Sequence, residues 1–142
     1  MRWMIMGLVW FVCGCINEDR RLFEVELRGE VVVVGGGSGA VHLELHHAQT
    51  GRGELTTPLG RIDETEIEGP GETSWTTLVP LGEGEGLVLY GWLDVDGDGL
   101  LCGAGTEVEE PAGVVVLAGV EHALEFSLEL GTGCAGPSAL YP

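Results

Sequence analysis

Three aspartates at alternate positions are the part of this sequence best suited to chemistry. Residues 93–100 read LDVDGDGL, with carboxylates at Asp94, Asp96 and Asp98. Calcium takes six to eight oxygen ligands, and loop positions one, three and five of a short turn supply three of them as carboxylates. Glycine at position six permits the sharp bend, and the backbone carbonyl of the next residue, here Leu100, adds a further ligand. The spacing therefore predicts a calcium loop.

Over these six or seven residues the chain resembles the calcium loops of EF-hands and dockerins. The preceding residues, 87–93, are apolar and predict a buried strand rather than the entering helix of an EF-hand. Position twelve, where an EF-hand has its bidentate glutamate, is Gly105, so that Glu107 becomes the nearest candidate for the last ligand. We expect weak binding, with a Kd of roughly 10⁻⁴ to 10⁻³ M. The alternative is an acidic hairpin turn without a metal, since Asp-Gly sequences favour turns.

A second candidate metal site consists of His42, Glu44 and His46, which alternate with Val41, Leu43 and Leu45. On a strand the three polar side chains share one face, about 7 Å apart. Two histidines and a carboxylate could bind zinc or iron. The alternative is that the three side chains form the solvated face of a half-buried strand, which is the more common reason for alternating polar and apolar residues.

The first fourteen residues have the composition of an export signal. Arg2 precedes an apolar run at 3–12, which is too short for a membrane-spanning helix of about twenty residues. The run ends in Val12-Cys13-Gly14-Cys15, which resembles the lipobox of bacterial lipoproteins, with Cys13 a mild departure. The resemblance implies cleavage after Gly14, a diacylglycerol on Cys15 and an anchor in the cell envelope, most simply the outer membrane. The alternative is ordinary cleavage that releases a secreted protein.

Removal of residues 1–14 leaves Cys102 and Cys134 as the cysteines without an assigned role. Outside the cytoplasm two such cysteines usually form a disulfide, whereas a thiol metal site would be expected to show C-x-x-C spacing. We therefore predict a Cys102–Cys134 disulfide. Residues 15–21 are short and polar and are interpreted as a tether.

The charge of the chain excludes one class of partner. The formal net charge is −17, with 6 basic residues against 23 acidic ones. No surface of such a chain can neutralise a run of phosphates, so nucleic acid is excluded as a partner. An anionic membrane surface would repel the domain. The N-terminal lipid must therefore attach the protein to the membrane. An envelope protein remains as a possible partner.

The rest of the chain predicts an all-β fold of about seven strands. Alternating or continuous apolar runs are separated by Gly and Pro turns, which is typical of a single antiparallel β-sandwich, here over residues 22–130. Gly29 is expected to interrupt the first run, residues 48–74 to hold one or two short exposed strands, and residues 131–142 to form a tail held only by Cys134.

The layout resembles the transthyretin-like and carboxypeptidase-regulatory-like sandwich modules of bacterial envelope proteins. The features that carry the resemblance are VELRGEVVV at 25–33, YGWLD at 90–94 and the aspartate loop that follows. An immunoglobulin-like topology is the alternative. Modules of this kind are structural or binding units, and the sequence has neither a G-x-S-x-G nor an H-E-x-x-H motif. We expect a calcium-stabilised envelope module; the alternative is a small metalloenzyme or metal-dependent binding protein that uses His42, Glu44 and His46.

Overall fold

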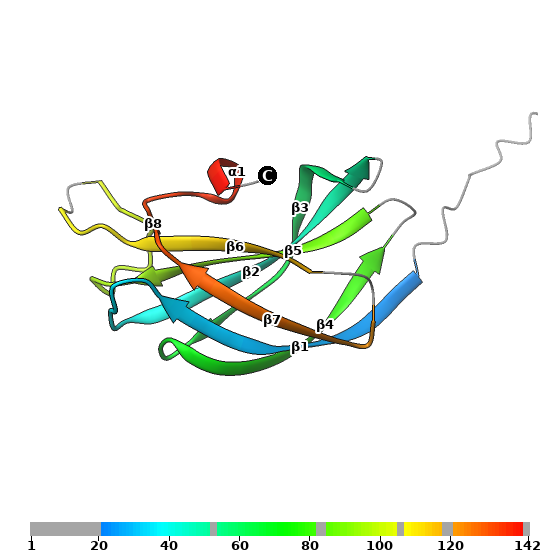
Figure 1. The fold of residues 1–142 in the computed structure, drawn as a ribbon, viewed down its shortest axis with the longest axis horizontal. Coiled ribbons are helices and arrows are strands. Elements are labelled where there is room, and N and C mark those ends of the chain that lie inside the picture. Colours follow the sequence, from blue (N-terminus) through cyan, green and yellow to red (C-terminus); the bar gives the residue numbers. More distant parts are fainter. Residues whose placement is uncertain (1–20, 52–53, 82–84, 105–106, 118–120, 141–142) are drawn as a thin grey trace, which may run out of the picture.

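A computed structural model describes residues 21–140 except for 52–53, 82–84, 105–106 and 118–120. These residues form two β-sheets packed face to face (Figure 1), which confirms the predicted all-β sandwich. The strands are β1 (Arg21–Val33), β2 (Ala40–Gly51), β3 (Glu54–Ile67), β4 (Gly71–Leu81), β5 (Glu85–Asp94), β6 (Pro111–Leu117), β7 (Ala123–Leu130) and β8 (Thr132–Gly133), followed by the short helix α1 (Pro137–Leu140). No helix in this part of the chain is long and apolar enough to cross a membrane.

One sheet has three strands in the order β4-β1-β7, and the other has five in the order β3-β2-β5-β6-β8. Most neighbours are antiparallel, as predicted, but β1 and β7 run parallel, with Glu26 opposite Ala123 and Val33 opposite Leu130. A parallel pair needs a long connection. Here the chain between β1 and β7 includes all the strands from β2 to β6, of which β4 lies in the same sheet as β1 and the other four lie in the opposite sheet.

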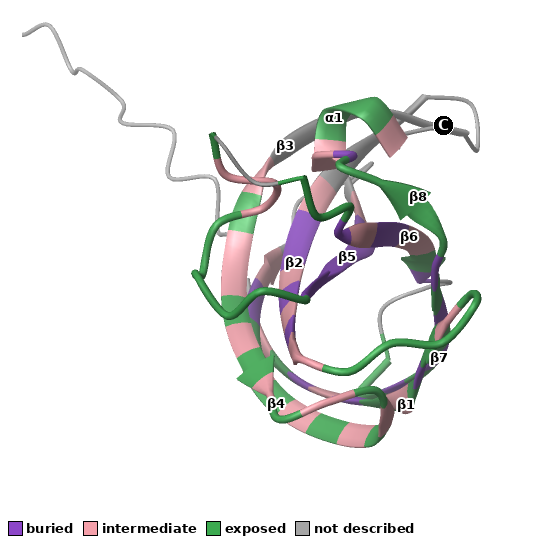
Figure 2. Cartoon of the chain, turned by 90° about the vertical axis from the view of Figure 1, so that its left-hand side faces the viewer, coloured by how far each residue is buried: buried purple, intermediate pink, exposed green. Residues whose placement is uncertain are grey.

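Period-two alternation explains which side chains form the core. In β7 the burial alternates strictly, with four apolar residues inside and Glu125, Ser127 and Glu129 among those outside. Strand β1 and residues 41–45 of β2 alternate in the same sense, and Figure 2 shows buried residues in the strands of both sheets. Burial of these side chains, at about 25 cal/mol per Å² of apolar surface, provides the main driving force for the fold.

Strand β1 passes through Gly29 without a break, contrary to the expectation from the sequence. A Cβ atom at Gly29 would lie 2.1 Å from the backbone oxygen of Phe126 and 2.6 Å from its ring. The glycine therefore allows β7 and its phenylalanine to pack closely against β1, which is a recognised reason for a glycine inside a strand.

Residues 48–74 are also more regular than predicted. They include the end of β2, all fourteen residues of β3 and the start of β4. The pairing of β2 with β3 shifts register between Leu45 and His46, between His47 and Ala48, and between Gln49 and Thr50. Such shifts are bulges, which disturb the simple alternation by which a strand is recognised in a sequence.

The C-terminal segment covers part of the outer face of the five-stranded sheet. Tyr90, Trp92 and Ala112 on this face form a second apolar cluster with Ala135, against which Leu101 and Leu140 pack. The Tyr90 hydroxyl donates a hydrogen bond of 2.9 Å to the backbone oxygen of Ala135. Burial raises the pKa of Tyr90, and the nearby Glu44 raises it further. This segment is therefore held by packing and hydrogen bonds as well as by Cys134.

Candidate metal centre

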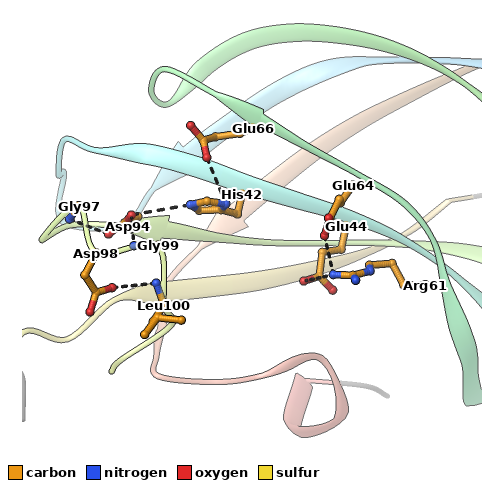
Figure 3. Close-up of polar contacts among 10 residues, drawn as sticks. All are labelled: His42, Glu44, Arg61, Glu64, Glu66, Asp94, Gly97, Asp98, Gly99 and Leu100. Carbon is orange, nitrogen blue, oxygen red and sulfur yellow. Dashed lines mark hydrogen bonds and ion pairs between the residues drawn. The ribbon is translucent and has the colours of Figure 1, made fainter. Parts of the chain in front are cut away.

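The aspartate loop begins where β5 ends, and the first carboxylate is held by the backbone of the loop (Figure 3). The two carboxylate oxygens of Asp94 accept hydrogen bonds from the N–H of Gly97, at 2.7 Å, and of Gly99, at 2.9 Å. Both glycines have φ near +75°, a conformation that a residue with a Cβ rarely adopts. The Asp-x-Asp-Gly-Asp-Gly spacing thus folds the chain around the Asp94 side chain.

The next two aspartates also bond to the backbone. Asp96 accepts from the N–H of Asp98 at 3.2 Å, and Asp98 accepts from the N–H of Leu100 at 2.7 Å. Both aspartates are exposed, as is the side chain of Leu100. The loop has the sharp turn that the sequence predicts for a calcium loop, with Leu100 directly after the second glycine.

A fourth carboxylate, Glu110, completes the cluster. One carboxylate oxygen each from Asp94, Asp96, Asp98 and Glu110 lies within 4.8 Å of the others. Glu110 is 1% exposed and Asp94 is 5% exposed. Oxygen ligands at this spacing suit a hard divalent cation such as calcium.

Glu110 also joins the two ends of the loop. One of its oxygens accepts from the N–H of Val95 at 3.1 Å, and the other accepts from the N–H of Cys102. Glu107, the candidate for the last ligand by its position in the sequence, is exposed and lies outside this cluster. Glu110 immediately precedes Pro111, the first residue of β6, so that its position is set by the pairing of β6 with β5.

The electrostatics of the cluster favour a cation. Burial acts to raise the pKa of Asp94, but the N–H groups of Gly99 and Gly97 and the nearby His42 lower it below the ordinary value of 3.8. The ion pairs of Arg28 and Arg61 lie elsewhere, with Glu26 for the first and with Glu44 and Glu64 for the second. Two buried carboxylates are thus brought together beside two exposed ones, and buried charge without an opposite charge is costly.

The predicted disulfide is present and lies at the exit of the loop. The Sγ atoms of Cys102 and Cys134 are 2.07 Å apart, and the bond closes a sequence separation of 32 residues. The N–H of Cys134 donates to the backbone oxygen of Glu110 at 2.9 Å. The disulfide and Glu110 therefore fix the same end of the loop to β6 and to the C-terminal segment.

The second predicted metal site has a different geometry. His42, Glu44 and His46 share the outer face of β2, as the sequence predicts, but their contacts diverge. His46 Nε2 lies 2.8 Å from a Glu44 oxygen, whereas His42 has one ring nitrogen 3.8 Å from Asp94 and the other 3.6 Å from Glu66. Among the described residues, one group of three or more metal-ligating side chains has its ligand atoms close together, namely the aspartate cluster with Glu110. The row of His42, Glu44 and His46 on β2 is not part of this group.

Comparison with known proteins found no match. No protein-family model matches the sequence, no curated protein matches it, and no solved structure matches the fold. The proposed lipidation site, Cys15, lies outside the described residues, together with the signal segment 1–14 and most of the tether 15–21.

Proposed function

We propose that this protein is a lipid-anchored lipoprotein of the bacterial cell envelope, and that its β-sandwich is a calcium-stabilised structural or interaction module. The N-terminal sequence, with its apolar run and its Val12-Cys13-Gly14-Cys15 end, supports the anchor. Envelope localisation also agrees with the disulfide, because such bonds persist outside the cytoplasm. We propose no catalytic role.

The observation that carries the calcium proposal is the burial of Glu110 next to Asp94. Both carboxylates are almost completely removed from water and share one cluster with Asp96 and Asp98. Backbone N–H groups satisfy their hydrogen bonds but supply no full positive charge. A bound divalent cation would supply that charge, and the oxygen-only ligand set favours calcium over zinc or iron.

The position of the aspartate loop supports a role in which the loop is exposed on the side away from the lipid anchor. The first residues of β1 lie at one end of the sandwich and the aspartate loop at the other (Figure 1). The thirteen residues of β1 span about 40 Å at roughly 3.3 Å per residue. A lipid on Cys15 would therefore hold the loop on the side of the domain that faces away from the membrane.

Two measurements on protein isolated from its native envelope test this proposal. Intact mass should show the loss of residues 1–14 and a diacylglyceryl adduct, and Cys15→Ser should no longer partition into detergent. Metal analysis should show calcium and no stoichiometric transition metal. Equal detergent partition of Cys15→Ser and wild type would refute the anchor. A stoichiometric transition metal would instead favour the alternative function based on His42, Glu44 and His46.

A further inference from the structure

A groove crosses the outer face of the five-stranded sheet beside the aspartate loop. Its volume is about 430 Å³, and Gly99 of the loop forms part of its wall. Cross-strand pairs place its polar side chains, with His42 opposite both Glu66 and Trp92, and Glu44 opposite Glu64. The side chains that matter below are His42, Glu44, Arg61, Glu64, Glu66 and Trp92.

The floor of the groove is a stacked aromatic pair. The rings of His42 and Trp92 have centroids 4.3 Å apart and an angle of 11° between their planes. Trp92 is only 6% exposed, whereas the His42 side chain remains 24% exposed. The His42 Nε2 atom is buried, has no hydrogen-bond partner and lies 3.8 Å from Asp94. The stack therefore fixes the imidazole in the groove, with its other nitrogen directed toward Glu66.

The walls of the groove carry more negative than positive charge. Glu44, Glu64 and Glu66 face a single arginine, Arg61, which forms ion pairs with the first two. A Glu66 carboxylate oxygen lies 3.6 Å from the Nδ1 atom of His42, which is too long for a hydrogen bond. The Glu66 carboxylate is exposed and therefore remains open to a donor from outside the protein.

We propose that this groove binds a basic side chain, lysine or arginine, presented by a protein partner. An ammonium or guanidinium group beside Glu66 would donate charge-assisted hydrogen bonds to its exposed carboxylate. A guanidinium could also stack on the exposed part of the His42 ring, as it does on other planar side chains. The net charge of −17 would attract such a partner over a longer range. The proposal names the partner class for the interaction module proposed above, and it rests on that role.

A second groove provides a matched comparison. It lies on the outer face of the three-stranded sheet, has a volume of about 720 Å³ and contains the facing pair Glu30 and Glu72. Its lining, among the residues that the structure describes, includes glutamates and Arg28 but neither histidine nor tryptophan. If acidity alone determined binding, the two grooves would bind a cation equally well. If the His42–Trp92 floor matters, the groove beside the aspartate loop will bind more tightly.

The test uses the mature lipidated protein in non-ionic detergent and a capped peptide of six arginines, titrated by calorimetry. A peptide of six glutamates is the control ligand. The salt concentration is about 0.15 M, at which charges more than roughly 8 Å apart are largely screened. Calcium is kept at one fixed millimolar concentration, so that the state of the aspartate loop does not vary.

Wild type is expected to bind the arginine peptide and not the glutamate peptide. Glu64→Gln with Glu66→Gln should weaken binding by about tenfold or more, since charge-assisted hydrogen bonds are lost. His42→Ala, which keeps every carboxylate, should also weaken it. The charge-matched control, Glu30→Gln with Glu72→Gln, should change affinity by less than about twofold.

Absence of peptide binding, or an equal loss in the two double variants, would overturn the proposal. Thermal unfolding of each variant in calcium and in chelator shows whether the calcium loop is intact. We expect it to be intact, because the substituted glutamates are exposed and lie outside the metal cluster. Absence of peptide binding while calcium still raises the melting temperature would refute the proposal of a basic partner alone. Loss of the calcium effect with peptide binding retained would refute the metal proposal alone.

Discussion

The aspartate loop and the polar row of strand β2 have similar residue types, but the side chains converge in the loop and diverge in the row. Both have, at alternate positions, three side chains of the types that can bind a metal. In the loop the three carboxylates converge with Glu110 to within 4.8 Å. In the row, Glu44 pairs with His46 while His42 contacts carboxylates of other strands.

The difference comes from the backbone between the side chains. A strand places alternate residues on one face but keeps them about 7 Å apart, so their ligand atoms meet only if long side chains bend toward one another. A turn with glycines at positive φ brings the carboxylates around one point. Alternation alone therefore does not predict a metal site; the glycines at 97 and 99 make the distinction.

Removal of the disulfide should have the largest effect on this comparison, because the disulfide lies at the exit of the aspartate loop. Cys102→Ser with Cys134→Ser opens a loop of 32 residues and should lower the free energy of unfolding by about 3–4 kcal/mol. Calcium affinity should fall as well, since Cys102 follows the loop directly. Urea unfolding and calcium titration of both proteins measure these effects. Unchanged calcium affinity would show that the loop does not depend on its covalent anchor.

Truncation of Glu110 is the next most severe change. In calcium, Glu110→Ala should lower the free energy of unfolding by about 2–3 kcal/mol, because the N–H groups of Val95 and Cys102 lose their acceptor. Glu107→Ala, the matched control at an exposed glutamate, should change it by less than about 0.5 kcal/mol. Urea unfolding in calcium compares the two. Equal effects would mean that burial of Glu110 contributes nothing to the loop.

The smallest expected effect is a pH dependence of stability that comes from Glu44 in the polar row of β2. The hydrogen bond from His46 lowers the pKa of Glu44 below its ordinary value of 4.5, and Arg61 acts in the same direction against the effect of burial. A lowered folded-state pKa means that ionised Glu44 stabilises the fold above about pH 4.5 and that this contribution is lost as the pH falls through the folded-state value.

Glu44→Gln should therefore be less stable than wild type near neutral pH, with a difference that shrinks as the solution is acidified below about pH 4.5. Unfolding by urea at a series of pH values measures that difference. A difference that stays constant with pH would show that the charge of Glu44 does not contribute.

Local patterns predicted several local features of this molecule, although not the continuity of β1 through Gly29 or the length of β3. The alternation in β2 and β7, the turn formed by the aspartates, and the cysteine pair could be read from neighbouring residues and from the number of cysteines. The parallel pairing of β1 with β7 could not, because strand pairing over such a sequence distance depends on the packing of the whole sandwich. Glu110 was missed for the same reason: the pairing of β6 with β5 places it under the loop, whereas sequence distance favoured Glu107.

Calcium-dependent thermal unfolding tests the central claim most directly. Calcium that binds only the native state adds about 1.4 kcal/mol of stability at tenfold excess over Kd and about 2.7 kcal/mol at a hundredfold excess. Wild type in about 10 mM calcium should therefore melt at least about 4 °C higher than in chelator. Asp96→Ala should lose this increase, and the same concentration of magnesium should give less of it, since magnesium dehydrates reluctantly. Equal melting temperatures for wild type in calcium and in chelator would contradict the calcium site and leave the loop as an acidic turn.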